Sequence, residues 1–286
     1  MPSFDTPGPL AVTVDLDSGE LRLAASERSD TVVVVTPCDP SVDADVRAAE
    51  RARVVCSNGK LLVGTAPTGK GEPIGSLHVL IELPAGSTLR GRATAAGLHA
   101  TGRLDGCRFI TVAGDIRLEH TGPLVLSTSS GDITAGQVEG AAEISTGRGE
   151  IRIARIAGSA EITNSYGPTA LGEVTGALRF SSADGRVSVG RAGGAVHVTT
   201  SGGDVRIDEV VRDTVLLKTA SGALDIGIRE STAARFDLDS RSGNVFVAPE
   251  VATAPTAPED RVRVRARAGN GSVHVRRSRL TATAAH

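Results

Sequence analysis

Glycine recurs along this chain at an almost constant interval, and this interval constrains the fold more than any other feature of the sequence. Successive members stand 17 to 19 residues apart, and the last step is 21 residues. The series comprises Gly97, Gly114, Gly131, Gly149, Gly167, Gly185, Gly203, Gly222 and Gly243. Gly271 is a later member that follows an insertion. A short fixed period of this kind indicates a solenoid, in which each repeat packs only against its neighbours.

Apolar residues alternate on both sides of each glycine. The residues two and four positions after it are apolar in most repeats, as in Val187 and Val189. The residues five and seven positions before it are also apolar, as in Val198 and Val196. Alternation with a period of two predicts a strand with one face inward, so each repeat holds two short strands with opposed inner faces. A third apolar column, expected at a corner, comprises Val138, Ile156, Val174 and Val210.

Strands that recur at the same point of each repeat pair in parallel with their counterparts. We therefore predict an all-β fold, a single-chain parallel β-helix (β-solenoid) with coils of 17–19 residues and a β-rich N-terminal cap. Only 2% of the residues are aromatic, so the core is expected to be aliphatic. The predicted organisation is a cap over 1–92 that is continuous with the solenoid, a solenoid over 93–280 with a loop insertion near 249–260, and a tail over 281–286.

The first 92 residues do not keep the period, but they contain strand and turn signals. In chain order we expect a hairpin over 12–25, a strand over 31–37, a helix over 39–52, a hairpin over 53–65, a loop over 65–76 and a strand over 77–86. Ser41 or Asp43 is the expected N-cap of the helix. Asn58 and Gly59 are expected at the turn of the second hairpin. Because the end of a solenoid is an unpaired strand edge, this segment is expected to cover it.

A short polar side chain stands three positions before each glycine. The column comprises Thr94, Thr111, Thr128, Thr146, Asn164, Ser182, Thr200, Thr219 and Ser240. Such side chains satisfy backbone groups in turns, although a polar row can also bind a regularly spaced polymer. The column runs through every coil, which favours the structural role. Acids directly after the glycine (Asp115, Asp132, Glu150, Asp204) alternate with Arg117, Arg152 and Arg206, and we expect cross-coil charge pairing on a solvated face.

Composition and motifs narrow the classes of function. The net charge of −2 gives no general reason to expect nucleic acid or an anionic membrane as partner. The sequence contains neither a run of apolar residues that could span a membrane nor a secretory signal, so a cytoplasmic location is expected. Cys38, Cys56 and Cys107 lack metal-ligand spacing and are expected to be buried. Catalytic, nucleotide-binding and metal motifs are also missing, so no catalytic residue, cofactor or metal is assigned, and a non-enzymatic role is favoured.

One coil departs from the pattern. After Gly167 comes a proline, and the first inner position is Thr169. Tyr166, the one tyrosine of the chain, precedes this turn and lies close in sequence to Asn164. In the next coil Arg186 interrupts the row of acids. Tyr166, Asn164 and Arg186 are therefore candidate interaction residues, and ordinary drift of one repeat is the alternative explanation.

The C-terminal segment is rich in arginine. In "RVRVRARAGNGSVHVRRSRL" the alternation places Arg261, Arg263, Arg265 and Arg267 on one face of a strand. A basic edge strand discourages aggregation. The functional alternative is an anion-binding patch at Arg261, Arg263 and Arg265, although aromatic residues for base stacking are missing there, which disfavours nucleic acid.

The repeat itself resembles a known family. The pattern of Ser or Thr, two residues, Gly, an acid and then alternating Ile or Val occurs in "STSSGDITA", "STGRGEIRI" and "TTSGGDVRI". It resembles a widespread bacterial β-strand-repeat family of unknown function, often labelled "putative adhesin". Both ends of the chain look like those of its cytosolic members, so the resemblance covers nearly the whole sequence. It implies a single-chain parallel β-solenoid and supplies no catalytic residue, and the adhesin label fits poorly with the expected cytoplasmic location.

Three functions remain open at this point. The leading hypothesis is a non-enzymatic scaffold or interaction protein that presents solenoid faces to a protein or polysaccharide partner and self-associates into a homo-oligomer. The alternative is a carbohydrate-active or small-molecule enzyme with a groove on a solenoid face near Tyr166 or Arg186. The second alternative is a regulator that binds anions or nucleic acid through the C-terminal arginine-rich strand.

Overall fold

The computed structural model describes all residues of the chain except 1, 66–71, 254, 256 and 279–286. The chain divides into two compact units, Met1–Gly140 and Ala141–His286. The first unit contains β1 (Ser3–Asp5), β2 (Ala11–Ser26), β3 (Asp30–Pro37), α1 (Asp43–Arg51), β4 (Arg53–Ser57), β5 (Lys60–Gly64), β6 (Ser76–Pro84), β7 (Thr88–Leu104), β8 (Gly106–Ile110), β9 (Ile116–Thr121), β10 (Leu124–Ser130) and β11 (Ile133–Val138).

The second unit consists of strands and one short helix over its described residues. Its elements are β12 (Ala142–Arg148), β13 (Ile151–Ile156), β14 (Ala160–Tyr166), β15 (Thr169–Val174), β16 (Leu178–Asp184), β17 (Val187–Ala192), β18 (Val196–Gly202), β19 (Val205–Val210), β20 (Asp213–Ser221), β21 (Leu224–Ile228), β22 (Thr232–Ser240), β23 (Val245–Val247), α2 (Pro249–Ala252), β24 (Asp260–Asn270) and β25 (Val273–Arg277).

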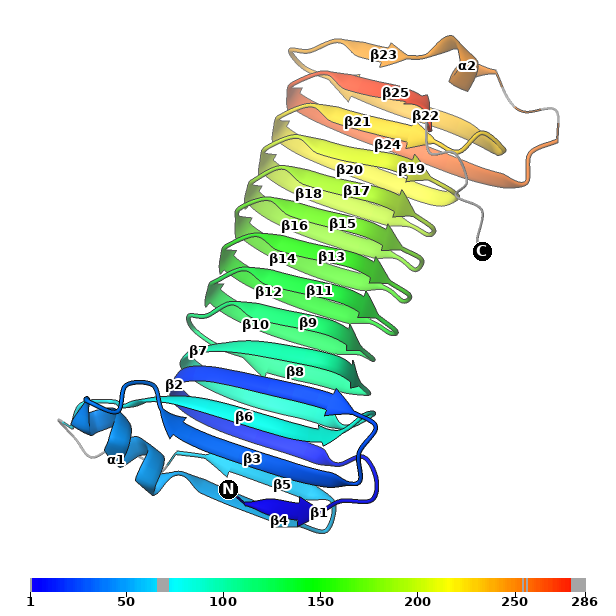
Figure 1. Ribbon diagram of the computed structural model, residues 1–286. Coiled ribbons are helices and arrows are strands. Elements are labelled where there is room, and N and C mark those ends of the chain that lie inside the picture. Colours follow the sequence, from blue (N-terminus) through cyan, green and yellow to red (C-terminus); the bar gives the residue numbers. More distant parts are fainter. Residues whose placement is uncertain (1, 66–71, 254, 256, 279–286) are drawn as a thin grey trace. The chain divides into compact units, whose positions relative to one another are not determined.

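Successive coils stack in parallel, as predicted (Figure 1). In the second unit β12, β14, β16, β18 and β20 form one sheet, and β13, β15, β17, β19 and β21 form the other. The register follows the repeat, because Val187 pairs with Thr169 on one side and with Val205 on the other. In the first unit β8 pairs with β10 and β9 with β11, again in parallel. The prediction of a parallel β-solenoid is confirmed.

The core consists of aliphatic ladders between the two sheets. Val187, Val189, Val196 and Val198 are each at most 2% exposed, as the alternation predicts. The corner column is buried as well, at 0–1% exposure for Val138, Ile156, Val174 and Val210. Branched aliphatic side chains fill most of this core, and Phe109 and Phe180 are buried among them.

The repeating glycines stand where one coil lies directly on the next. The φ angle of Gly185 is +139°, in a range that side chains rarely adopt, and a Cβ atom there would overlap the carbonyl oxygen of Gly167. The same relation joins Gly203 to Gly185 and Gly222 to Gly203. Only glycine therefore allows the backbone to stack at this corner.

The polar column before the glycine serves the turn, as predicted. The Thr128 hydroxyl donates to the carbonyl oxygen of Ser130 (3.1 Å), and Thr219 donates to Ser221 (3.0 Å). Thr94, the first member, is exposed instead. The hydroxyl thus donates to a carbonyl group of its own turn, two residues further along the chain.

The order of layers at the C-terminal end differs from the order in the sequence. We expected the coil around Gly243 to follow that of Gly222, with Gly271 last. In the structure β24 pairs with both β20 and β22, and β25 pairs with both β21 and β23. A Cβ on Gly271 would overlap the carbonyl oxygen of Gly222, and one on Gly243 would overlap that of Gly271. The earlier strands β22 and β23 therefore form the terminal layer, and the later strands β24 and β25 lie between them and the layer of β20 and β21.

A similar insertion occurs at the N-terminal end. Residues 12–25 do not form the predicted hairpin, because β2 is one strand that turns a corner near Gly19 (φ +130°). It pairs with β7 on one side and with β5 and β6 on the other. A hairpin and a strand bent around a corner share the same alternation, so the pattern alone does not distinguish them.

The cap consists of antiparallel strands and one helix. The hairpin of β4 and β5 turns at Asn58 (φ 50°) and Gly59 (φ 70°), as predicted. The predicted helix is present as α1, but neither Ser41 nor Asp43 caps it: the N-cap residue is Val42, without a side-chain hydrogen bond. β3 pairs antiparallel with β6, which ends the parallel stack. Residues 66–71, which are half of the predicted loop over 65–76, lie outside the described residues, and the division at residue 92 stays a prediction.

Replacing Gly185 by alanine is expected to lower the free energy of unfolding by about 3 kcal/mol, because the backbone of two coils must separate and φ is strained. Urea unfolding followed by circular dichroism measures the loss. Gly106→Ala is the control, since its Cβ would meet Pro123 O at an ordinary 3.6 Å. Equal losses at the two glycines would contradict close backbone stacking as the constraint.

Candidate functional site

At the turn around Gly167, an aromatic, a basic and an acidic residue lie side by side on neighbouring strands. Tyr166 ends β14 and is 55% exposed. Its register partners on the flanking strands are Arg148 in β12 and Asp184 in β16, at the usual strand spacing of about 4.8 Å. Arg186 is exposed on the neighbouring coil, and its carbonyl oxygen accepts a hydrogen bond from the Thr169 amide (2.9 Å). The structure therefore brings Tyr166 and Arg186 to the same corner.

Asn164 lies beneath this surface rather than on it. The side chain is fully buried, and its amide nitrogen donates to the carbonyl oxygens of Gly149 and Gly167, both at 3.1 Å. It also donates to the hydroxyl of Thr169 at 3.1 Å. The side-chain amide of Asn164 thus bonds to the turns of two coils, and it also gives the hydroxyl of Thr169, a polar residue at an inner position, a hydrogen-bond partner. The side chain serves the turn and is not available to a partner.

In the coils of β12, β14 and β16, the buried polar column contains atoms without a hydrogen-bond partner among the described residues. Within the described residues, Thr146 Oγ1, Asn164 Oδ1 and Ser182 Oγ have no hydrogen-bond partner. The three residues are register partners on successive strands. Buried polar atoms of this kind are the usual partners of ordered water. The departure from the repeat therefore includes unpaired polar atoms in the core as well as a change at the surface.

The arginine-rich strand lies inside its sheet. The arginines of β24 are exposed and alternate with buried residues, as predicted. However, β24 lies between β20 and β22, so the interpretation as a protective edge strand is wrong. β18 and β20 separate it from β16 and hence from the Tyr166 turn.

Two of these arginines share one acid as their ion-pair partner. Arg267 donates to Asp237 Oδ1 at 2.7 Å, and Arg265 lies 3.6 Å from Asp237 Oδ2. The hydrogen bond from Arg267, followed by the charges of Arg267 and Arg265, lowers the pKa of Asp237. Arg265, a predicted contact residue, is therefore already engaged.

Three other arginines gather beside this pair. Arg263 has Arg235 of β22 as its register partner on one side and Thr214 of β20 on the other. Arg261 lies two residues away on the same face. Over the described part of the chain, none of the three guanidinium groups forms an ion pair. The sequence analysis missed Arg235, because only the inserted position of β24 places it here.

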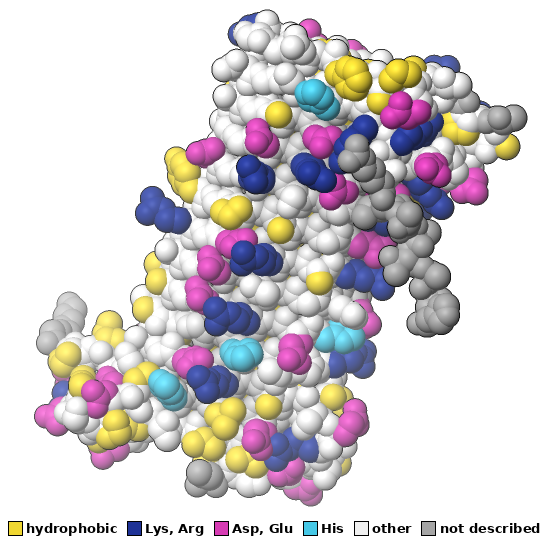
Figure 2. Space-filling view, turned by 45° about the horizontal axis from the view of Figure 1, so that its top comes forward, with side chains coloured by type: hydrophobic (Ala, Val, Ile, Leu, Met, Phe, Trp, Pro, Cys, Tyr) yellow, Lys and Arg dark blue, Asp and Glu magenta, His cyan; other side chains and the backbone are white. Residues whose placement is uncertain are grey.

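Elsewhere the outer faces are electrically balanced. On the face that Figure 2 shows, basic and acidic side chains lie interspersed. Cross-coil pairs do form, as between Arg155 and Glu173 (3.4 Å) and in the pair of Arg191 with Glu209 (3.3 Å). The pairs predicted to cross coils instead lie along one strand: Arg117 with Asp115, Arg152 with Glu150, and Arg206 with Asp208.

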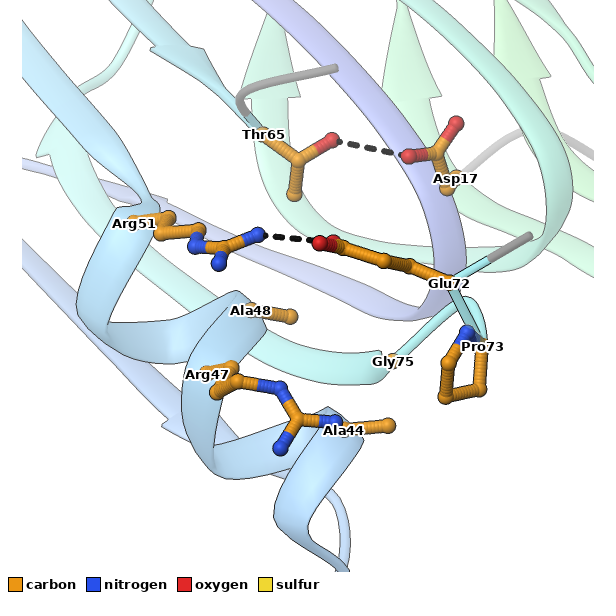
Figure 3. A pocket seen from close by; sticks show the side chains of 9 residues that line it. All are labelled: Asp17, Ala44, Arg47, Ala48, Arg51, Thr65, Glu72, Pro73 and Gly75. Carbon is orange, nitrogen blue, oxygen red and sulfur yellow. Dashed lines mark hydrogen bonds and ion pairs between the residues drawn. The ribbon is translucent and has the colours of Figure 1, made fainter. Parts of the chain in front are cut away.

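Two hollows lie in the first unit. The cavity beside α1 has a volume of about 20 Å³, which holds about one water molecule; Arg51 and Glu72 form an ion pair of 3.0 Å there, and Thr65 donates to Asp17 (Figure 3). A shallow hollow of about 640 Å³ is lined by Ser3–Leu10 and Cys56–Gly59. Among the described residues, no group of three or more His, Cys, Asp or Glu side chains could hold a metal ion.

The cysteines differ from one another. Cys107 is buried in the core, and burial raises the pKa of its thiol to about 12. Cys38 and Cys56 are only half-buried, so the expectation of burial was wrong for them. Burial, with smaller contributions from Asp45 and Glu20, also raises the pKa of the Cys38 thiol. Raised pKa values disfavour the reactive thiolate at Cys107 and Cys38.

Comparison with known families identifies the fold. The family model described as Toastrack DUF4097 matches residues 107–279, which is more than half of the chain. The chain belongs to this family. The match confirms the resemblance seen in the repeat, and the matched Toastrack segment contains every candidate interaction residue named above. In the described part of the chain, no helix has the length and apolar character needed to cross a membrane.

Several solved structures are similar over nearly their whole length. One is called a putative adhesin from Parabacteroides distasonis ATCC 8503, with 12% identity, coverage of 96% of this chain and 95% of that chain, and a TM-score of 0.39. Another, called a putative adhesin from Bacteroides fragilis NCTC 9343, has 12% identity, coverage of 96% of both chains and a TM-score of 0.34. None of the curated proteins compared with this Toastrack chain matches it.

Replacing Asn164 by alanine is expected to cost about 3 kcal/mol of unfolding free energy, because two buried carbonyl groups and a hydroxyl lose their donor. Tyr166→Ala, two residues away but exposed, should change it by less than about 0.5 kcal/mol. Asn164→Thr, which restores the residue found in most coils, should recover part of the loss. Urea unfolding measures all three, and a larger loss at Tyr166 than at Asn164 would contradict these roles.

Proposed function

We propose that this Toastrack protein is a non-enzymatic scaffold that presents its outer sheet faces to a protein or polysaccharide partner and that it self-associates. One observation carries the proposal. The outward positions are in register from strand to strand, and one outward column repeats the same chemistry over four strands. The clearest case is an outward column of hydroxyl groups on β12, β14, β16 and β18, formed by Ser145, Thr163, Ser181 and Thr199.

The column has the properties of a binding surface for an extended ligand. Its members follow each other at the strand spacing of about 4.8 Å. Thr163 Oγ1 lies 3.2 Å from Ser181 Oγ, so neighbouring hydroxyl groups are close enough to share one ligand group. The buried ladders beneath hold the strands rigid, so a partner would bind without ordering the surface. The cytoplasmic location stays a prediction.

The enzyme alternative has less support. It requires a groove near Tyr166 or Arg186, but both hollows described above are lined by residues of the first unit alone. The acids and arginines of the outer faces form ion pairs with one another, as between Arg155 and Glu173. Such pairing leaves fewer groups free to act on a substrate.

Substituting the hydroxyl column should abolish capture of the partner. We expect Thr163→Arg with Ser181→Arg to reduce retention of a bacterial polysaccharide or protein ligand at least tenfold, because two long cations cover the column. Ala170→Arg with Ser188→Arg, at outward positions on the other sheet, is the matched control. Array binding and pull-down measure retention. Equal retention by both variants, or none by the wild type, would contradict the proposal.

Anion binding is the second candidate, and a specific observation favours it. Arg235, Arg261 and Arg263 form a cationic cluster without an acid partner among the described residues, and like charges on neighbouring strands repel each other. An anion that bridges the guanidinium groups would relieve this repulsion, since guanidinium binds phosphate and carboxylate groups in a bidentate manner.

Salt-dependent binding of a single-stranded oligonucleotide would test this candidate. Changing Arg235, Arg261 and Arg263 to serine should abolish binding at low salt. Arg265→Ser with Arg267→Ser should weaken it less, because both guanidinium groups already pair with Asp237. Fluorescence anisotropy at several salt concentrations measures the affinity and its salt slope. Binding that is independent of salt, or lost equally in both variants, would rule the cluster out.

A further inference from the structure

The terminal layer of the second unit has an open edge. Among the described residues, β22 pairs with β24 alone and β23 with β25 alone. β22 is nine residues long, so its outer side presents a row of backbone N–H and C=O groups without strand partners. Edges of this length are normally covered or made short, because they pair with other chains.

The hydrophobic core is also uncovered at this edge. Phe236 and Leu238, at inner positions of β22, are only half-buried, and Val245 of β23 is 45% exposed. Their counterparts one layer below, Val264 and Val273, are fully buried. The end of the core is therefore apolar as well as unpaired.

The short helix α2 covers only part of this end. Ala248 and Val251 are buried beside β25, and the Ala248 amide bonds to the carbonyl oxygen of Val275. Arg277 holds the same segment through the carbonyl oxygens of Glu250 and Thr253. These contacts lie on the side of β23, so the edge of β22 stays open.

The charges on β22 are self-complementary. If two copies of β22 pair antiparallel around Phe236, each Arg235 faces the Asp237 of the other copy, and the two Phe236 side chains meet on the core side. A centre at Arg235 or Asp237 would instead place a charged residue opposite itself, which is unfavourable. Phe236 is thus the centre that pairs opposite charges and buries the aromatic residue.

We propose that a second copy of this chain docks on the β22 edge, in an antiparallel pair centred on Phe236. The inference rests on the self-association in the proposed function and names its surface. A two-fold arrangement pairs the β22 edge of each copy with that of the other, so the assembly closes as a dimer. It also brings an acid to Arg235, whose guanidinium forms no ion pair with any described residue of its own chain.

Light scattering on the full chain over a range of concentrations tests the oligomeric state. The expected mass rises with concentration towards twice the chain mass of 29.2 kDa. Arg235→Asp places like charges opposite each other and should weaken dimerisation at least tenfold. The exchange Arg235→Asp with Asp237→Arg restores opposite charges and should recover the dimer.

Cross-linking tests the register in a chain whose Cys38 and Cys56 are replaced by serine. Phe236→Cys should form a disulfide-linked dimer on oxidation, because residue 236 faces itself. Ala233→Cys on the same strand is the matched control and should stay monomeric under denaturing conditions, since its own copy lies about 20 Å away along the strand pair.

The outcomes distinguish failure of the β22 interface from failure of self-association in general. A dimer that cross-links equally at both positions, or that ignores Arg235→Asp, would overturn the β22 interface and leave self-association standing. A strict monomer, including one that holds a different protein at this edge, would overturn both. Partner capture by the hydroxyl column is measured separately and does not depend on either result.

Discussion

Direct stacking of one glycine backbone on the next is the contact on which the solenoid depends. At Gly167, Gly185 and Gly203 the space for a Cβ atom is filled by the carbonyl of the preceding coil, so coils can approach to the spacing of hydrogen-bonded strands at their corner. The hydroxyl three positions earlier then satisfies a turn carbonyl. Register, ladder packing and corner geometry all follow from this approach, since a shift of one residue would turn the apolar ladders outward.

The ends of the solenoid obey a different rule, because a terminal coil has only one neighbour. In each unit the chain inserts one segment between two others, β2 at the N-terminal end and β24 with β25 at the C-terminal end. An inserted strand is paired on both sides and cannot fray without breaking two ladders. The N-terminal layer is further covered by antiparallel strands and α1, whereas β22 has β24 as its one strand partner in the described part of the chain.

The outer faces are the surface available for function. Many charges on them form short-range ion pairs, and such exposed pairs contribute little stability. Three local features stand out from these paired charges. They are the Tyr166 turn, the hydroxyl column and the cluster of Arg235, Arg261 and Arg263. A regular core holds these groups at fixed spacings, which suits recognition of a partner better than chemistry at a converging site.

The sequence by itself determined the coil: its length, its two strands, the buried ladders and the glycine corner, because each depends on contacts that repeat at a constant interval. It also predicted the hairpin at Asn58 and the outward arginines of β24. It did not determine the single bent strand β2, since alternation is the same in a hairpin. Nor did it determine the order of the last layers, the burial of Asn164 or the meeting of Arg235 with Arg263. These depend on which coil lies next to which, and a repeat whose members are nearly equivalent carries no local signal for that choice.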